Sequence, residues 1–230
     1  MPVEGDELAR SVVEKADRSR LPQDAFQVDV AITTTAPGKD PEIRKYRILS
    51  KGNDNTVVLT LEPLIDRGQI LLMRGHDLWI FMPNLSQPIR LSVAQRLTGQ
   101  VANGDLARAN FATDYTPRIV GTSDCGGELC YALELAAVDR SVTYHRVSYW
   151  ISQKTGRPIR AEFYSLSDQL LKTAVYQNVR NLGGQPRPTE ILISNALRAE
   201  EKSLLEYSNL KLRDLPDKMF TKEYLKKFDY

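Results

Sequence analysis

The spacing of apolar residues along the chain changes after its first twenty positions. Over residues 6–20, apolar side chains recur every three or four positions, which predicts an amphipathic helix. Its stripe consists of Leu8, Ala9, Val12, Val13 and Ala16. Pro22 marks the end of this helix. From Phe26 onward apolar residues alternate with mostly polar or small ones, which is typical of a half-buried strand.

Strand patterns of this kind fill residues 25–82 and 117–194, and turns rich in glycine and proline separate them. Short strands joined by short turns predict one antiparallel sheet of about ten or eleven strands. Two runs, Ile70–Met73 and Leu78–Met82, are apolar at nearly every position. We therefore expect both faces of the sheet to be covered there.

Residues 83–116 interrupt the strand pattern. Ser92–Thr98 resembles a short capped helix. A turn is expected at Asn103–Asp105, followed by a second short helical piece through Ala109 to Phe111. Long excursions in compact domains are usually lids or binding loops, so this segment is predicted to form a helical lid. Residues 195–230 are expected to form a C-terminal tail, and residues 1–230 a single domain.

The charge balance excludes some classes of protein. The chain of 230 residues has 31 basic and 29 acidic side chains, which argues against a dedicated nucleic-acid binder. No apolar run is long enough to predict a transmembrane helix. The acidic residues near the start do not resemble a signal peptide, which fits either a cytosolic protein or the mature form of an exported one.

Recognisable catalytic and cofactor motifs are missing from the sequence, so we expect no enzyme, no metal site and no cofactor. His76 and Asp77 are adjacent, but neighbours on a strand point to opposite faces and would not form an acid–base pair. An ester hydrolase stays an alternative that would require a serine or cysteine close to His76 or His145.

The two cysteines, Cys125 and Cys130, flank a Gly126-Gly127 pair that is typical of a hairpin loop. They could form a disulfide across this loop, or they could be two free buried thiols. A zinc site would need two further ligands. The residues alone leave the first two alternatives open.

Aromatic residues lie on or beside the predicted strands and the helical excursion. Core packing is the usual role of any one of them. Together with the doubly apolar strands and the amphipathic helix, they favour a curved sheet that helices close around an apolar cavity.

Several segments, in this order, resemble the outer-membrane lipoprotein-sorting proteins, which are relatives of the periplasmic carrier LolA. The strongest likeness is Asp77–Pro83, a strand with tryptophan, an aromatic residue and proline, followed by Arg90. The others are Glu14–Arg20, Asn103–Asp105 with Asn110–Tyr115, Tyr149–Ile151 with Pro158, Phe163 and Tyr176, and Asp217–Leu225.

The resemblance implies a LolA/LolB-like fold, mainly β with helices: an incomplete antiparallel β-barrel closed by an N-terminal helix and a helical lid. It also implies a non-catalytic, monomeric carrier that binds acyl chains of lipoproteins or another lipid and moves them toward the outer membrane. An inner-membrane transporter and an outer-membrane acceptor would be its partners, and nucleic acid would not. The alternative is a lipid-binding or partner-binding module of an envelope export or sensing system that transports nothing.

Members of this family are exported, so the resemblance favours the periplasm over the cytosol. It thereby favours the Cys125–Cys130 disulfide, because that compartment is oxidising. Arg90 is a candidate for contact with the lid or a lipid headgroup. The residues expected to bind lipid are Leu8, Val12, Trp79, Phe81, Leu97, Phe111, Tyr149 and Phe163. A shift of one residue in strand parity would replace Trp79 and Phe81 by Leu78, Ile80 and Met82.

Overall fold

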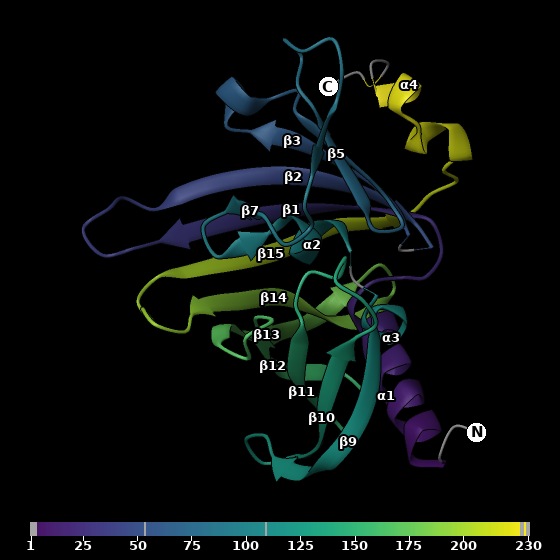
Figure 1. The fold of residues 1–230 in the computed structure, drawn as a ribbon, viewed down its shortest axis with the longest axis vertical. Coiled ribbons are helices and arrows are strands. Elements are labelled where there is room, and N and C mark those ends of the chain that lie inside the picture. The colour runs from purple at the N-terminus through teal and green to yellow at the C-terminus, as the bar shows by residue number, and fades with distance from the viewer. Residues whose placement is uncertain (1–3, 53, 109, 226–227, 229–230) are drawn as a thin grey trace.

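The computed structural model describes residues 4–52, 54–108, 110–225 and 228 (Figure 1). The first element is the predicted helix, α1 (Glu4–Arg20). Five short helices follow: η1 (Leu64–Asp66), α2 (Asn103–Ala107), α3 (Phe111–Asp114), η2 (Asp217–Phe220) and α4 (Lys222–Leu225). Among the described residues, none of these helices is long and apolar enough to cross a lipid bilayer.

Strands make up most of the remaining structure. They are β1 (Phe26–Thr35), β2 (Glu42–Lys51), β3 (Asn55–Glu62), β4 (Ile70–Arg74), β5 (Asp77–Phe81), β6 (Ile89–Leu91), β7 (Arg96–Thr98), β8 (Val101–Ala102), β9 (Tyr115–Asp124), β10 (Leu129–Ala137), β11 (Arg146–Ser152), β12 (Pro158–Tyr164), β13 (Leu170–Leu182), β14 (Gln185–Asn195) and β15 (Lys202–Leu212). Within the described part of the chain, β7 and β8 form a separate hairpin and the other thirteen strands form one sheet.

The large sheet is antiparallel and unclosed, with the order β6-β5-β4-β3-β2-β1-β15-β14-β13-β12-β11-β10-β9. It bends strongly between β1 and β9, and α1 lies beside β9 and α3 (Figure 1). The predicted class, a mainly β fold built on an incomplete antiparallel barrel with helices, is therefore confirmed. The number of strands is larger than predicted.

Strand β15 lies within residues 195–230, which were predicted to form a tail. It pairs with β1 from Phe26↔Leu212 to Thr35↔Lys202, and with β14 on its other side. It therefore joins the two halves of the sheet. Its alternation is hard to recognise because Leu204 and Leu205 are adjacent and Asn209 takes a positive φ of 54°.

The predicted helix at Ser92–Thr98 is also wrong. Arg96–Thr98 forms strand β7, and a tight turn at Gly99, with φ 50°, returns the chain to β8. A Cβ atom on Gly99 would lie 2.3 Å from Oγ1 of Thr34, so the turn packs directly on the large sheet. Packing of Gly99 against the large sheet favours a hairpin over a helix here. This contact joins residues far apart in the sequence, so the local pattern does not reveal it.

Apolar side chains gather in two clusters on opposite faces of the sheet. The inner cluster joins the sheet to helices α1 and α2. Its members include Ala9, Val13, Phe26, Val30, Leu78, Tyr149 and Leu205. The outer cluster consists of Leu49, Val57, Leu59, Ile70, Leu72, Leu215, Phe220 and Leu225, with Trp79 and Phe81 packed against it. The expectation that β4 and β5 are covered on both faces is thus correct.

The two clusters also settle the parity of β5, which was predicted the wrong way round. Trp79 and Phe81 contact the outer cluster, whereas Leu78 and Ile80 belong to or pack against the inner cluster. Every position of β5 after Asp77 is apolar, so period-two alternation carries no information about which face is inside.

The segment after β15 covers the outer cluster. Its residues 213–225 lie beside β3 and β4, at the upper right of Figure 1. The ammonium of Lys222 lies 4.1 Å from the centre of the Trp79 ring, and Lys51 Nζ lies 2.6 Å from Oδ1 of Asp217. At the other end of the molecule, Cys125 and Cys130 form a disulfide across the β9–β10 turn.

We expect Phe220→Ala to lower the free energy of unfolding by about 3–5 kcal/mol, because it would leave a cavity in the outer cluster. Phe220 is 2% exposed there. Urea denaturation measures the change. Leu64→Ala is the control, since Leu64 is 74% exposed and should change stability by less than about 0.5 kcal/mol. Equal effects of the two substitutions would show that the C-terminal segment does not stabilise the sheet.

Candidate functional site

Residues 103–108 and 110–114 of the chain, here called the covering segment, include α2 and α3 and lie over the inner face of the sheet. The segment is attached to α1 through the backbone of one residue, Ala112. The backbone N–H of Ala112 donates to Oδ2 of Asp17 at 2.9 Å, and Arg10 Nη1 donates to the Ala112 carbonyl at 2.8 Å. Helix α3 is thereby fixed against helix α1.

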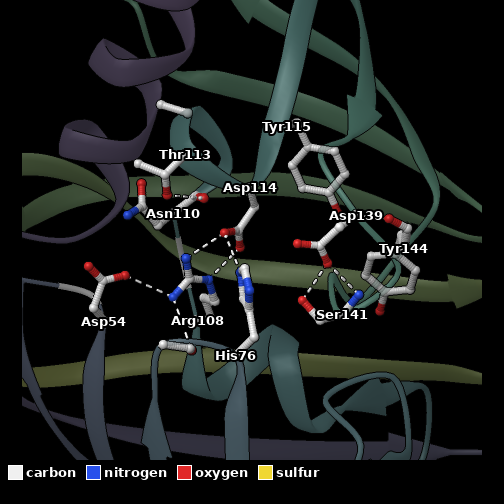
Figure 2. Close-up of polar contacts among 12 residues, drawn as sticks. Asp54, His76, Arg108, Asn110, Thr113, Asp114, Tyr115, Asp139, Ser141 and Tyr144 are labelled. Atoms are coloured by element: carbon white, nitrogen blue, oxygen red, sulfur yellow. Dashed lines mark hydrogen bonds and ion pairs between the residues drawn. The ribbon is translucent and has the colours of Figure 1, made fainter.

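A second attachment joins the covering segment to two turns of the sheet (Figure 2). Arg108 donates two hydrogen bonds to the carboxylate of Asp114, and both side chains are buried. Its Nη1 also donates to Oδ1 of Asp54 at 2.9 Å and to the Gly75 carbonyl at 3.2 Å. His76 Nε2 lies 3.0 Å from Oδ1 of Asp114. Loss of either partner of the buried Arg108–Asp114 pair would be costly.

A third attachment holds α2 through Asp105. Lys172 Nζ lies 2.6 Å from Oδ2 of Asp105 and donates to the Gln100 carbonyl at 2.7 Å. The Tyr144 hydroxyl donates to Oδ1 of Asp105 at 2.7 Å. All three attachments are polar and directional, so they fix the position of the covering segment more than they add to its stability.

Beneath the covering segment lies a small cavity of about 30 Å³. Its walls come from the covering segment and from strands on both sides of β14, and they include Phe111, Tyr144, Phe163, Tyr176, Ile193 and Leu205. A space of this size holds little more than one or two water molecules. In this arrangement of the covering segment, the cavity has no room for an acyl chain.

The predicted lipid-binding residues divide into three groups. Phe111 and Phe163 line the cavity, and the Tyr149 ring lies 5.4 Å from the Phe111 ring. Val12 and Leu97 are partly buried against the inner cluster without lining the cavity.

The third group lies away from the cavity. Leu8 is 50% exposed, because the buried face of α1 runs through Ala9, Val13 and Ala16. Trp79 and Phe81 contact the outer cluster, as described above. Arg90, predicted to contact the lid or a headgroup, is exposed and pairs instead with Asp77, which neighbours it across the β5–β6 edge.

One residue of the cavity was missed by the sequence analysis. Arg20 is 9% exposed, and its guanidinium lies 4.9 Å from the centre of the Phe111 ring and 5.5 Å from that of Tyr176. A signal for it exists in the sequence. Asp17 and Arg20 continue the three- and four-residue spacing of Val13 and Ala16, so two charged residues occupy the apolar stripe of a helix.

The buried carboxyl of Asp17 has an altered acidity. Burial raises its pKa to about 7, although Arg20 and the N–H of Ala112 both lower it. The negative charge of Asp114 raises it further. The Asp17 carboxyl therefore keeps its proton to a higher pH than an exposed aspartate does.

The side-chain partner that the described part of the chain gives His76 is a carboxylate and not a serine or cysteine. His76 bonds to Asp114, and both cysteines are in the disulfide. The hydroxyl of Ser141, which lies in the same region of Figure 2, bonds to Asp139.

The comparisons with known proteins identify the family. A LolA superfamily protein of Nitrosomonas europaea has 56% sequence identity over 94% of this chain and 98% of its own, with a TM-score of 0.90. The chain belongs to the LolA superfamily. A family model described only as an uncharacterized protein matches residues 52–227, and no curated protein matches.

Two more distant structures share the superfamily fold. A DUF1329 family protein of Desulfovibrio piger has 21% identity and a TM-score of 0.80, over 97% of this chain and 100% of its own. A domain of Vibrio parahaemolyticus named for outer membrane lipoprotein sorting has 18% identity and a TM-score of 0.80, over 96% of this chain and 99% of its own. At these identities the likeness concerns the fold.

The raised pKa of Asp17 predicts a specific dependence of stability on pH. Between its ordinary pKa of 3.8 and its folded value of about 7, the folded state holds a proton that the unfolded chain has released. The free energy of unfolding should therefore fall as pH rises through this window. Asp17→Asn should remove this part of the dependence, measured as the difference in melting temperature between pH 4.5 and 7.5.

Asp24→Asn is the matched control, because it makes the same chemical change at an exposed residue. This variant should keep the pH dependence of the unsubstituted protein. If Asp17→Asn follows the same pH profile as that control, the carboxyl of Asp17 is not the buried proton acceptor inferred above.

Proposed function

We propose that this protein binds acyl chains of lipoproteins or another lipid beneath the covering segment, which acts as a lid, and carries them through the periplasm toward the outer membrane. The observation that carries the proposal is a curved sheet whose apolar inner face is covered by a segment fixed through polar contacts. Membership of the LolA superfamily supports it.

The chemistry of the site fits reversible binding. Each buried methylene group contributes about 0.8 kcal/mol, so an acyl chain can be held firmly by the inner cluster without any covalent step. The cavity of about 30 Å³ has to enlarge for this, and movement of the lid is the change that opens it.

The disulfide between Cys125 and Cys130 supports the periplasm as the compartment, because disulfides persist where the surroundings are oxidising. In that setting the carrier would receive its cargo from an inner-membrane transporter and deliver it to an outer-membrane acceptor. Both partners are part of the proposal.

Native mass spectrometry of the protein purified from the bacterial envelope tests the proposal. Bound lipid, together with saturable uptake of a fluorescent fatty acid, is the expected result. Transfer of the label between vesicles distinguishes a carrier from a module that binds lipid without transporting it. Absence of both bound lipid and uptake would rule the proposal out.

Phe111→Asp should weaken uptake of the fluorescent fatty acid by about tenfold or more. The substitution removes an aromatic wall of the cavity and introduces a carboxylate that can pair with Arg20 in the space that the chain would occupy. Leu197→Asp is the control, because Leu197 is 79% exposed on the β14–β15 turn. Unchanged uptake by the Phe111 variant, with its circular dichroism spectrum preserved, would mean that α3 is not part of the lid.

A further inference from the structure

We infer that the cargo is an acyl chain with an anionic end group, and that Arg20 binds this end group inside the cavity. The inference rests on the proposed function and narrows its cargo to a lipid that carries an anion, since ester-linked or amide-linked acyl groups of a lipoprotein are neutral. It assigns a chemical class to the ligand, because an arginine in this position distinguishes an anion from a neutral lipid of the same length.

The first observation is that Arg20 is buried with unused donors. Its Nε and Nη1 atoms have no hydrogen-bond partner although both are inaccessible to solvent. Buried polar groups are nearly always hydrogen-bonded, and a buried charge without a partner is expensive. Arginine cannot escape this cost by losing its proton. The protein therefore does not supply all the hydrogen-bond acceptors that the positive charge of Arg20 requires.

The second observation is that Asp17 is a weak counterion. Among the described residues, Asp17 is the carboxylate within ion-pair distance of Arg20, and the two atoms, Oδ1 and Nη1, are 3.9 Å apart. Its other oxygen, Oδ2, already accepts the N–H of Ala112. Partial protonation of Asp17 near neutral pH reduces its charge further.

Acids elsewhere around the cavity are also engaged. Asp105 is bonded to Lys172 and Tyr144, and Asp114 is bonded to Arg108 and His76. These carboxylates are therefore matched with other groups, and none of them neutralises Arg20. An external anion can supply what is missing.

The third observation is the position of the guanidinium between two small cavities. One is the cavity of about 30 Å³ under the lid, with apolar walls that include Phe163, Ile193 and Leu205. The other, of about 10 Å³, is lined by Arg20, Leu21, Tyr176, Pro188, Ile191 and Tyr207. An acyl chain on the apolar walls would thus bring a terminal anion to Arg20.

The two aromatic rings beside Arg20 would allow its guanidinium to exchange one of them for an anionic ligand. Phe111 and Tyr176 hold the guanidinium through their ring faces while the lid is closed. Movement of α3 would withdraw Phe111 and uncover one side of the guanidinium. A carboxylate or phosphate, which forms charge-assisted hydrogen bonds with arginine, would then replace a weaker contact by a stronger one.

The test compares three ligands that share a chain of sixteen carbon atoms: hexadecanoate, hexadecyl phosphate and hexadecanol. Each is titrated at pH 7 against protein loaded with the neutral fluorescent probe N-phenyl-1-naphthylamine. We expect the unsubstituted protein to bind at least one of the anions about tenfold or more tightly than the alcohol, since a hydrogen bond to a charged group contributes that much. A preference for one anion identifies a carboxylate or a phosphate monoester as the end group.

In Arg20→Met the ratio of anion to alcohol affinity should fall to about one, and in Arg20→Lys part of the preference should remain. The ratio is measured within each variant, so a change in lid packing that affects all ligands equally does not alter it. Arg18→Met is the matched control, because Arg18 lies on the same helix but is exposed and pairs with Glu14. That variant should keep the preference.

Equal affinity of the unsubstituted protein for the alcohol and both anions would overturn the inference and leave the proposed function standing. So would an undiminished preference in Arg20→Met. Binding of none of the three ligands, nor of the probe, would overturn the proposed function as well. Because the comparison on the unsubstituted protein is decisive by itself, the test does not depend on the folding of a variant.

Discussion

The apolar inner face of a curved, unclosed sheet is the constraint on which the rest of this structure depends. Such a face cannot remain exposed to water, and two different kinds of cover meet the requirement. Helix α1 packs closely against the inner face through small, buried side chains, namely Ala9, Val13 and Ala16. The covering segment relies on Asp17, Asp105 and Arg108, whose polar contacts have a defined geometry. The inner face is therefore covered by the apolar stripe of α1 and by a segment that adds these polar contacts to the buried side chains of Leu106 and Ala107.

Charge is concentrated where the covering segment meets α1. Asp17 lies on α1, accepts the backbone of α3 and faces Arg20, so one carboxyl connects the helix, the covering segment and the arginine of the cavity. Its proton affinity and the position of α3 are thereby linked.

The sequence pattern predicts the class of fold well, and the reasons for its errors are physical. Helix α1 and most strands follow from periodicity, because each has one face in the core and one facing outward. Strand β5 is apolar on both faces, so Trp79 and Phe81 could not be assigned to a side. Strand β15 lacks clear alternation, and β7 depends on the packing of Gly99 against Thr34.

The site was predicted less completely than the fold. Phe111 and Phe163 were found because aromatic residues on the excursion and on inward-facing strands tend to surround a cavity. Arg20 was missed because charged residues are normally assigned to the solvent side of a helix. Its spacing with Val13 and Ala16 contradicts that assignment, and only the structure shows that the burial is real.

The central position of β15 has a consequence for how the chain folds. The strand that joins the two halves is the last of the sheet to be synthesised, and it pairs with β1, the first. Neither half can pair its open edge until β15 has been synthesised. Pairing across such a long separation in sequence is slow, because the loop has to close before any contact stabilises it. The chain therefore stays incompletely folded during synthesis, which is the state in which a polypeptide can be threaded through a narrow translocation channel.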